Sequence, residues 1–266
     1  MISNILIAVD DIKYVNDYRK VGISTFLFPL DEYCVGYKTY TLEEINKQEV
    51  SNKYILINRL LDCKSVDKLK ELLKKLNNIK GIVYEDIAVY MLAKELKLDV
   101  ELIFFQNHFQ TNTESVNFWL EKVDSIVISN ELTKEEITNI VNNSQKEVCL
   151  HLYGYNQVMY SRRLLLTNWS EEFALDKENN NTIVDRATKV KFHAIENEYG
   201  TVMYSGNIFN GHSLLDEKNI KYFYINPTLI DHQEVMSFLN DIENYNNENE
   251  DNGFLEKETI YKLKEV

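Results

Sequence analysis

The sequence predicts a single (β/α)-barrel of the TIM type, an α/β fold over residues 1–266 with a β-hairpin inserted between the seventh and eighth strands. Strand-like and helix-like segments alternate along the chain with few interruptions, which favours parallel strands joined by right-handed crossovers. Eight segments have strand character, as a closed barrel requires, and the chain of 266 residues has the length of about 250 residues that such a barrel takes. A doubly wound open sheet is the alternative, but no glycine-rich phosphate loop follows the first strand.

The predicted strands are short apolar segments, and most of them precede a helical pattern. The strands cover residues 4–9, 24–30, 54–59, 81–86, 102–107, 125–131, 147–153 and 222–225. Capping boxes at Thr41–Glu44 and Thr133–Glu136 open two of the helices. The other helices are predicted over residues 65–78, 87–96, 114–123 and 234–242, the first of them with Ser65 as its N-cap.

The connection between the seventh and eighth strands is long, and residues 169–222 form the predicted insertion. Residues 190–195 and 201–205 alternate in polarity around a turn, which is typical of a β-hairpin. We expect the insertion to lie over the carboxyl face of the barrel, where such enzymes place their chemistry. Residues 177–181 are expected to form a mobile loop, and residues 243–253 a flexible acidic linker before a closing strand at 254–264.

The composition limits the classes of function. A formal net charge of −13 repels nucleic acid in bulk, so contact with RNA requires a local basic pocket or a basic partner. We expect no membrane span, because no apolar run approaches roughly 20 residues. Cys34, Cys63 and Cys149 are widely spaced and provide neither a disulfide framework nor a CxxC metal motif, so we expect a cytoplasmic protein.

The stretch 147–169 carries an unusual group of polar residues. Cys149, His151 and Tyr153 alternate on one face of its strand, which we expect to face the barrel interior, and Gly154 is expected to end the strand. Behind it follows a polar cluster of Tyr160, Ser161, Arg162 and Arg163. Each guanidinium could clamp a carboxylate or phosphate, or could pair with Glu131 or Glu147. For His151 we favour a structural role.

Further candidates lie at the carboxyl ends of other predicted strands. Glu131 ends the sixth strand, Asn107 and His108 end the fifth, and Glu85 precedes Asp86 at the end of the fourth. Adjacent residues in a strand point to opposite faces, so at most one of Glu85 and Asp86 looks inward. We expect Arg162 and Glu131 to line one pocket, with Arg162 holding an anionic group.

Three blocks of the sequence resemble the collagenase-like peptidase family, peptidase U32. They are residues 129–137, with a strand ending in Glu131; the group 153–155, 159–163 and 165–168; and residues 198–201, with 259–262 similar to the closing strand of the family. The resemblance implies a barrel-like catalytic domain. It also implies one of two activities, since members were described as collagen-degrading proteases, while others hydroxylate RNA bases or quinone rings without oxygen.

The resemblance further implies an iron–sulfur cluster on four cysteines in several members, and prephenate as the oxygen donor in the RNA cases. Here the usual histidine before the signature glycine is Tyr153, and the cysteine positions of the signature hold Gln157 and Leu164. We therefore expect no cofactor within this chain, with a cysteine-containing paralogue of the same family as a partner. Neither a GxSxG nor an HExxH motif is present, and Ser161 could be a nucleophile only if His108 or His151 reached it.

The sequence thus predicts an RNA hydroxylation enzyme or a cysteine-less subunit of one, with a pocket for an anionic small molecule. A peptidase of the collagenase-like type and a non-catalytic binding subunit are the alternatives. We assign a catalytic role to Glu131, Tyr153 and His108. The predicted substrate-binding residues are Tyr160, Ser161, Arg162, Arg163, Asn107 and Glu85.

Overall fold

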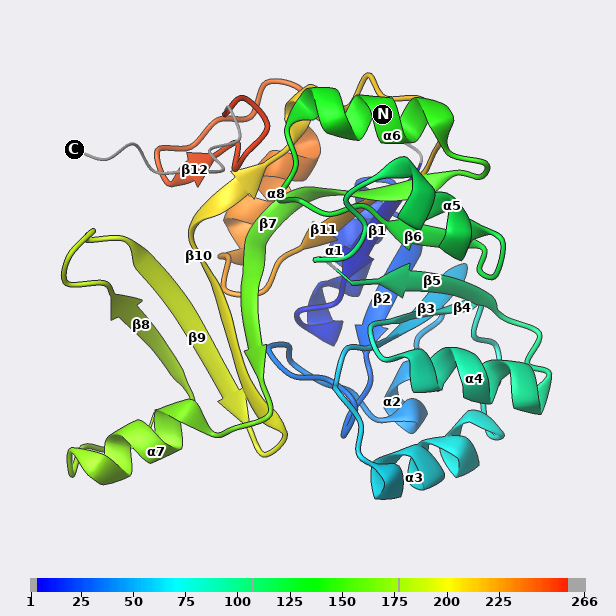
Figure 1. Cartoon of the computed structure of the whole chain (residues 1–266), viewed down its shortest axis with the longest axis horizontal. Helices are drawn as coiled ribbons and strands as arrows, with labels where there is room; N and C mark the ends of the chain where they lie inside the picture. The colour runs from blue at the N-terminus through cyan, green and yellow to red at the C-terminus, as the bar shows by residue number, and fades with distance from the viewer. Residues whose placement is uncertain (1–3, 107, 177, 258–266) are drawn as a thin grey trace.

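A computed structural model describes residues 4–257 of the chain, with the exception of 107 and 177. Its centre is a closed barrel of eight parallel strands, which confirms the predicted fold (Figure 1). The strands of the barrel are β1 (Ile5–Ala8), β2 (Thr25–Pro29), β3 (Asn52–Ile57), β4 (Gly81–Tyr84), β5 (Glu101–Phe105), β6 (Ser125–Val127), the first part of β7 (Val148–Ser161), and β11 (Ile220–Asn226).

The last of these strands closes the barrel. β11 pairs in parallel with β1 on one side, where Leu6 lies opposite Tyr224, and with β7 on the other, where Cys149 lies opposite Tyr222. The sheet therefore has no free edge within the ring. This closure rules out the doubly wound open sheet.

Helices cover the outside of the ring, and the core has two layers. The helices are α1 (Val15–Lys20), α2 (Leu42–Asn46), α3 (Cys63–Leu73), α4 (Ile87–Leu96), α5 (Thr113–Leu120), α6 (Lys134–Asn143) and α8 (His232–Asn240). Outward side chains such as Ile126, Val148 and Leu150 pack beneath the helices. Inward side chains, among them Leu56, Val83 and Cys149, fill the barrel. The alternation predicted for the first part of β7 correctly places Cys149 inside the barrel and its neighbours Val148 and Leu150 outside.

Two details of the helices differ from the prediction. α1 was not foreseen, because six residues are too few for a clear apolar periodicity. α3 begins at Cys63 with Asp62 as its N-cap, whose side chain accepts a hydrogen bond from the Ser65 amide. Ser65 is therefore inside the helix, although both residues have side chains suited to capping. Both predicted capping boxes are present at α2 and α6.

A second group of strands extends from β7 outside the ring, and we call it the extension. β10 (Gly200–Asn210) lies antiparallel to β7, followed by β9 (Lys191–Asn197) and β8 (Asn180–Val184), with α7 (Leu165–Glu172) at its end (Figure 1). β9 and β10 confirm the predicted hairpin. The expectation of a loop at residues 177–181 is wrong for residues 180 and 181, which pair with β9.

Gly154 is the point at which β7 leaves the barrel wall. Its φ of +131° is unfavourable for other residues, and a Cβ at this position would meet the Asn226 carbonyl oxygen at 2.3 Å. The strand bends here and continues to Ser161 along β10. The expectation that Gly154 ends the strand is therefore wrong, since the glycine provides a bend within it.

α7 is anchored to the extension by a buried carboxylate. Glu196 of β9 is 3% exposed and accepts hydrogen bonds from the Leu166 amide at 2.7 Å and the Thr167 amide at 3.0 Å. The hydroxyls of Thr167 and Thr201 also donate to it. The negative charge thus satisfies free amides in the first turn of the helix and complements its dipole.

The segment after α8 is held more firmly than the sequence suggested. The expected flexible linker contains β12 (Glu250–Asp251), which pairs with β10, and Tyr245, which packs against Phe238 of α8. Residues 254–257 form a turn instead of a strand, and the rest of the expected closing strand lies outside the described residues. In the described part of the chain, no helix has the length and apolar character needed to span a membrane.

Candidate functional site

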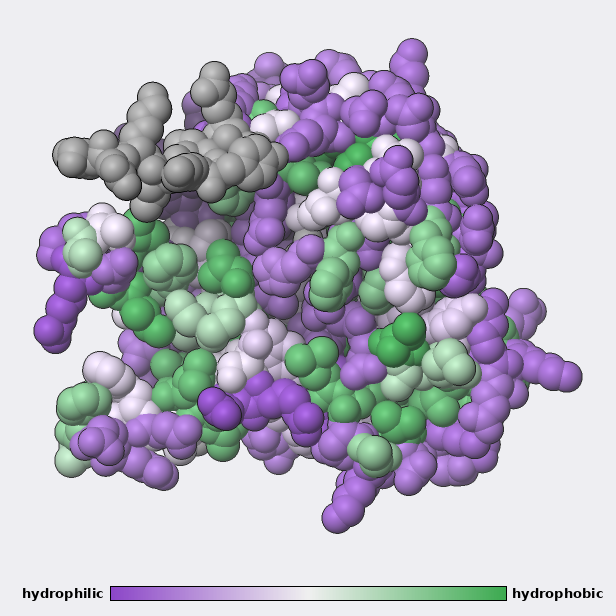
Figure 2. Space-filling model, in the orientation of Figure 1, coloured by the Kyte–Doolittle hydropathy of each residue, from purple (hydrophilic) through white to green (hydrophobic). Residues whose placement is uncertain are grey.

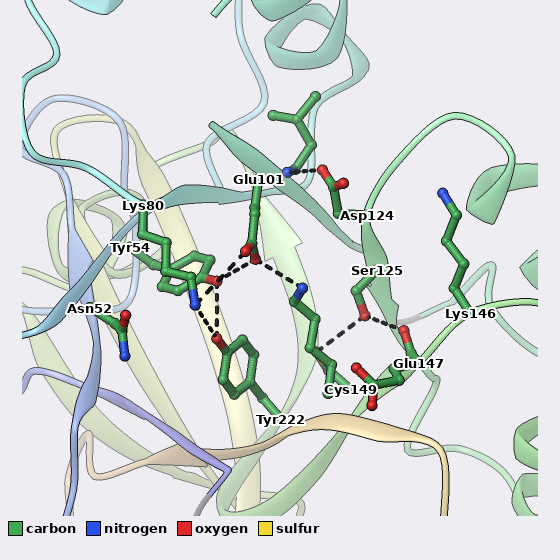
Figure 3. Close-up of polar contacts among 12 residues, drawn as sticks. Asn52, Tyr54, Lys80, Glu101, Asp124, Ser125, Lys146, Glu147, Cys149 and Tyr222 are labelled. Atoms are coloured by element: carbon green, nitrogen blue, oxygen red, sulfur yellow. Dashed lines mark hydrogen bonds and ion pairs between the residues drawn. The ribbon is translucent and has the colours of Figure 1, made fainter. Parts of the chain in front are cut away.

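Polar side chains fill both ends of the barrel, and those at the amino end form a closed network (Figure 3). The Tyr54 hydroxyl donates to Glu101 at 2.5 Å and lies 3.1 Å from the Tyr222 hydroxyl. Lys221 binds the same carboxylate at 2.9 Å, and Lys80 lies 3.8 Å from it. These groups satisfy one another's hydrogen bonds and charges at the amino end of the barrel, so we assign them a structural role.

The carboxyl end has a different character, because it combines buried polar side chains with the partly exposed Glu85. We call it the mouth of the barrel. Continuing the inward positions of β3, β4, β7 and β11 brings four polar residues to this end: Asn58, Glu85, His151 and Asn226. The loop after β2 enters the mouth, where Cys34 and Tyr37 pack against the inner cluster. The Tyr37 hydroxyl lies 3.2 Å from that of Tyr224.

Glu85 is the acidic residue among these four. Desolvation by the surrounding protein raises the pKa of this carboxyl group to about 8, although the side chain is only partly shielded from solvent. Its neighbour Asp86 turns outward, accepts a hydrogen bond from the Ala88 amide and caps α4. The strand alternation thus places one carboxylate inward and one outward.

The extension packs over this mouth. The Tyr204 hydroxyl of β10 donates to the Gly36 carbonyl oxygen at 2.9 Å, and Val202 and Tyr204 pack against Val35 of the loop after β2. Gly36 has a φ of +85°, and a Cβ there would lie 2.6 Å from the Tyr204 hydroxyl oxygen. Arg59 stacks on Tyr199, with its guanidinium carbon 3.9 Å from the ring centroid. The loop and the extension therefore form one wall of the mouth.

His151 is built into this wall. Its Nδ1 lies 2.8 Å from Asn156 Oδ1, its Nε2 lies 3.1 Å from the Tyr153 carbonyl oxygen, and its ring stacks on Phe209. Burial lowers the pKa of the imidazole to about 4, so it is neutral at pH 7. The favoured structural role of His151 agrees with these contacts.

The structure brings two of the predicted catalytic residues together. His108 Nδ1 lies 3.1 Å from Glu131 Oε1, and both side chains are 47% exposed. The interpretation of Glu131 as an inward residue of the sixth strand is wrong, because β6 ends at Val127 and Glu131 lies in the following turn. The pair forms an exposed rim at the carboxyl ends of β5 and β6.

Tyr153, the third predicted catalytic residue, does not face the barrel interior. The pairing of β11 with β7 shifts by one residue between His151 and Tyr153, and this irregularity turns Tyr153 to the outside. Its ring stacks on Phe238 of α8 at 3.8 Å, and its hydroxyl donates to Glu250 at 2.9 Å. The prediction of an inward Tyr153 is therefore wrong.

The polar cluster after Gly154 occupies the far part of β7. Arg162 is exposed and lies 3.7 Å from Asp62, so the predicted contact with Glu131 is not formed. Arg163 is also exposed, and its amide donates to the Ser161 hydroxyl. Tyr160 is partly buried, and its hydroxyl lies 3.4 Å from the Tyr199 carbonyl oxygen and the Leu60 amide. Asn107 lies outside the described residues.

Sequence reasoning missed the tyrosines at both ends of the barrel, Tyr222 in the network at the amino end and Tyr37, Tyr204 and Tyr224 at the mouth. Tyr222 and Tyr224 are two positions apart in β11, and this spacing was a signal that both face inward. Tyr37 and Tyr204 gave no comparable signal. Their place depends on the path of a loop and on a bulge in β10, where the pairing with β7 shifts between Met203 and Ile208.

The cysteines do not fit an iron–sulfur cluster. Cys34 donates its thiol to the Leu56 carbonyl oxygen, and burial raises the pKa of Cys34 to about 12 and of Cys149 to about 11. Cys63 is exposed at the start of α3. Within the described ranges no three metal-ligating side chains converge. The absence of a cluster from this chain stays a prediction, which iron analysis of anaerobically purified protein tests.

A further concave surface lies on the extension, away from the mouth. Trp169, Ile183 and Val184 line a groove of about 410 Å³ between α7 and the sheet. All three side chains are exposed, and Figure 2 shows apolar surface gathered over the strands of the extension. Contiguous exposed apolar surface of this kind is typical of interaction sites.

Two proteins of one bacterium are similar to this chain in sequence. The chain is 28% identical to tRNA hydroxylation protein P2 of Bacillus subtilis over 174 residues, which cover 62% of this chain and 56% of that protein. It is 25% identical to tRNA hydroxylation protein P1 of the same organism over 138 residues, covering 48% of this chain and 33% of that protein. The matches therefore span only about half and a third of these relatives.

Among solved structures, a chitinase from Chromobacterium violaceum aligns with 91% of this chain and 100% of its own, with 9% identity and a TM-score of 0.45. The spore cortex-lytic enzyme SleL of Bacillus cereus aligns with 91% of this chain and 74% of its own, with 11% identity and a TM-score of 0.43. The sequence profile of peptidase family U32 matches residues 41–247, which include most of the barrel and the extension. The chain therefore belongs to peptidase family U32.

Proposed function

We propose that this chain takes part in tRNA hydroxylation, either as the enzyme or as a cysteine-less subunit of it, and that the mouth of its barrel is the reaction site. The alignment with tRNA hydroxylation proteins P2 and P1 carries this proposal. The polar mouth supports it, since enzymes with this fold act at the carboxyl face. tRNA modification also suits a cytoplasmic protein.

The contacts of Ser161 favour RNA modification over proteolysis. The two histidines considered as its base are engaged elsewhere, His108 with Glu131 and His151 with Asn156. Among the described residues no imidazole bonds to the Ser161 hydroxyl, which accepts a hydrogen bond from the Arg163 amide. A serine peptidase would need such a pair.

A paralogue of the same family is the proposed partner, and it would supply the cysteines that this chain lacks. Two separate relatives in one bacterium, P1 and P2, support the idea of related chains that work together. The groove of the extension offers an apolar surface for such a contact. Trp169→Ser should reduce copurification of a coexpressed paralogue, whereas exposed Phe118→Ser on α5 should not.

The exposed Arg162 and Arg163 are the proposed contacts for an anionic group, either a small carboxylate or an RNA phosphate. Arg162→Ala should then weaken RNA binding by about tenfold at low salt, as loss of a charge-assisted contact does. Lys64→Ala, an exposed cation at the start of α3, serves as the control. Equal weakening by both changes would indicate a general charge effect instead.

The function itself is tested by deletion of the gene in its own organism. Mass spectrometry of nucleosides from bulk tRNA should show loss of a hydroxylated nucleoside, and the wild-type gene should restore it. Unchanged nucleosides in the deletion strain would contradict the proposal. Gelatin cleavage that depends on Ser161 would instead favour a peptidase.

A further inference from the structure

The extension ends in a strand with a free edge. β8 pairs with β9 on one side, and among the described residues it is the last strand of the sheet (Figure 1). It keeps an unbroken register with β9, and its five residues, Asn180–Val184, are all exposed. They include neither a proline nor a charged residue, which are common means by which proteins prevent edge strands from pairing. The edge of β8 is therefore open to another strand.

The hydrogen bonds to β9 show which backbone groups of β8 point to the free edge. The Asp185 amide donates to the Val190 carbonyl oxygen at 2.9 Å, and the Glu196 amide donates to the Asn179 carbonyl oxygen at 2.8 Å. Hydrogen-bonded pairs alternate along an antiparallel strand, so the odd-numbered residues of β8 bind β9. Three residues direct their N–H and C=O groups to the free edge: Asn180, Thr182 and Val184.

This free edge is complementary to itself. When two copies of β8 lie antiparallel around a two-fold axis at Thr182, Asn180 of each copy is opposite Val184 of the other. All three outward residues then form hydrogen-bonded pairs, whereas an axis at residue 181 or 183 leaves one of them without a partner in β8. Thr182 is opposite its own copy, and threonine side chains form favourable pairs across strands.

The charges beside β8 favour the same register. Arg186 follows the strand by two residues and Glu178 precedes it by two, so pairing around Thr182 brings Arg186 of one copy beside Glu178 of the other. Both side chains are exposed, and neither is in an ion pair with another described residue. The two-fold axis gives two such contacts, and their attraction acts against the repulsion between chains of net charge −13.

We propose that two copies of this chain associate through β8, which pairs with its own copy around Thr182 and joins the two extensions into one continuous sheet. The same surface is used on both copies, so the contact closes as a dimer. This inference goes beyond the proposed function. It uses the edge of β8, whereas the groove proposed for the paralogue lies between α7 and the face of the sheet.

Sedimentation velocity of the full chain over a series of concentrations tests the association, and wild type should pass from monomer to dimer. Arg186→Glu places two acidic residues side by side at both ends of the contact and should weaken the association by about tenfold. Glu178→Arg combined with Arg186→Glu should restore it. Lys189→Glu makes the same change of charge in the same exposed turn without facing Glu178, so it should behave as wild type.

Cysteine crosslinking tests the register. Cys63→Ser first removes the exposed native thiol. In this background Thr182→Cys should form a disulfide-linked dimer on mild oxidation, because the Cα atoms of a hydrogen-bonded pair lie about 5.5 Å apart, within the range of a disulfide. Asn181→Cys is the matched control, since residue 181 of the other copy is displaced by two positions along the strand and exceeds the reach of about 7 Å.

The inference is overturned if wild type stays monomeric at its highest soluble concentration, if Arg186→Glu associates as wild type does, or if Asn181→Cys crosslinks as readily as Thr182→Cys. Its failure is separable from that of the proposed function. Trp169→Ser should leave the dimer in place while reducing copurification of the paralogue. A monomeric chain whose deletion removes a hydroxylated nucleoside would keep the function and exclude the dimer.

Discussion

Glu85 couples the stability of the fold to pH, because desolvation raises the pKa of its carboxyl group. Its pKa is about 8 in the folded chain against 4.5 as the ordinary value, so the folded state holds a proton that the unfolded state releases. The corresponding stability is complete below about pH 4.5 and is lost as the pH rises through about 8. Each pKa unit between the folded and unfolded states corresponds to about 1.4 kcal/mol of unfolding free energy.

Glu85→Gln should therefore flatten the pH dependence of the free energy of unfolding on the alkaline side. Urea unfolding of wild type and variant at about pH 6 and about pH 9 measures this, and the variant should be relatively more stable at the higher pH. Glu114→Gln, on the exposed first turn of α5, serves as the control. A variant that loses as much stability as wild type between the two pH values would show that Glu85 is already ionised.

Tyr153 has a structural hydroxyl, and Tyr153→Phe should cost roughly 0.5–1.5 kcal/mol of stability by removing its hydrogen bond to Glu250. Cellular tRNA hydroxylation should persist in this variant. Tyr155→Phe is the matched control, because no described residue forms a hydrogen bond with that hydroxyl. Loss of hydroxylation with unchanged stability would instead restore the predicted catalytic role of Tyr153.

The residues of the site show where reasoning from sequence succeeds. Strand alternation correctly separates Glu85 from Asp86 because β4 is regular up to its end. The same rule fails for Tyr153, since a single irregular pairing reverses the face. It fails for Glu131 because β6 is shorter than its apolar pattern. Irregularities of this kind depend on partner strands, which local sequence does not encode.

At the scale of the element, α7 depends on a carboxylate from another strand. Burial opposes ionisation of Glu196, but the hydrogen bonds from Thr167, Thr201 and the helix amides outweigh it and lower its pKa. The stability from this group is present above the ordinary pKa of 4.5 and is lost as the pH falls below it.

Glu196→Ala should accordingly destabilise the extension by on the order of 2–3 kcal/mol, because buried amides and hydroxyls lose their acceptor. Hydrogen exchange of α7 amides should accelerate while exchange of barrel strands changes little. Glu178→Ala, an exposed change nearby, is the comparison. Uniform acceleration throughout the barrel would mean that α7 unfolds only with the whole chain.

Most helices and strands were predictable from the sequence, and the elements that were missed lie mainly in the extension. The barrel strands and the β9–β10 hairpin follow from apolar runs and period-two alternation. β8 was missed because its five residues are all exposed and have no apolar face toward a core. The continuation of β7 beyond Gly154 was missed because glycine usually ends strands, whereas here it bends one.

For the molecule as a whole, we expect the amino end of the barrel to contribute stability and the carboxyl end to contribute binding. Lys221→Met should remove the cation that binds Glu101 at the amino end and cost about 1–2 kcal/mol. It should leave the proposed RNA binding by the folded protein unchanged. Thermal unfolding measures the change in stability and fluorescence anisotropy with a short labelled RNA measures binding, with exposed Lys64→Met as the control. A change in RNA affinity without a change in stability would contradict this division.

The closure of the barrel by β11 has a consequence for synthesis on the ribosome. Until residues 220–226 emerge, β1 and β7 each present an open edge within the future ring, and Tyr224 is missing from the mouth. A nascent chain in this state exposes unpaired backbone and apolar side chains to other chains. The barrel and its mouth are therefore completed in one late event, and truncation before Ile220 should yield a chain that chaperones bind and that cannot close on its own.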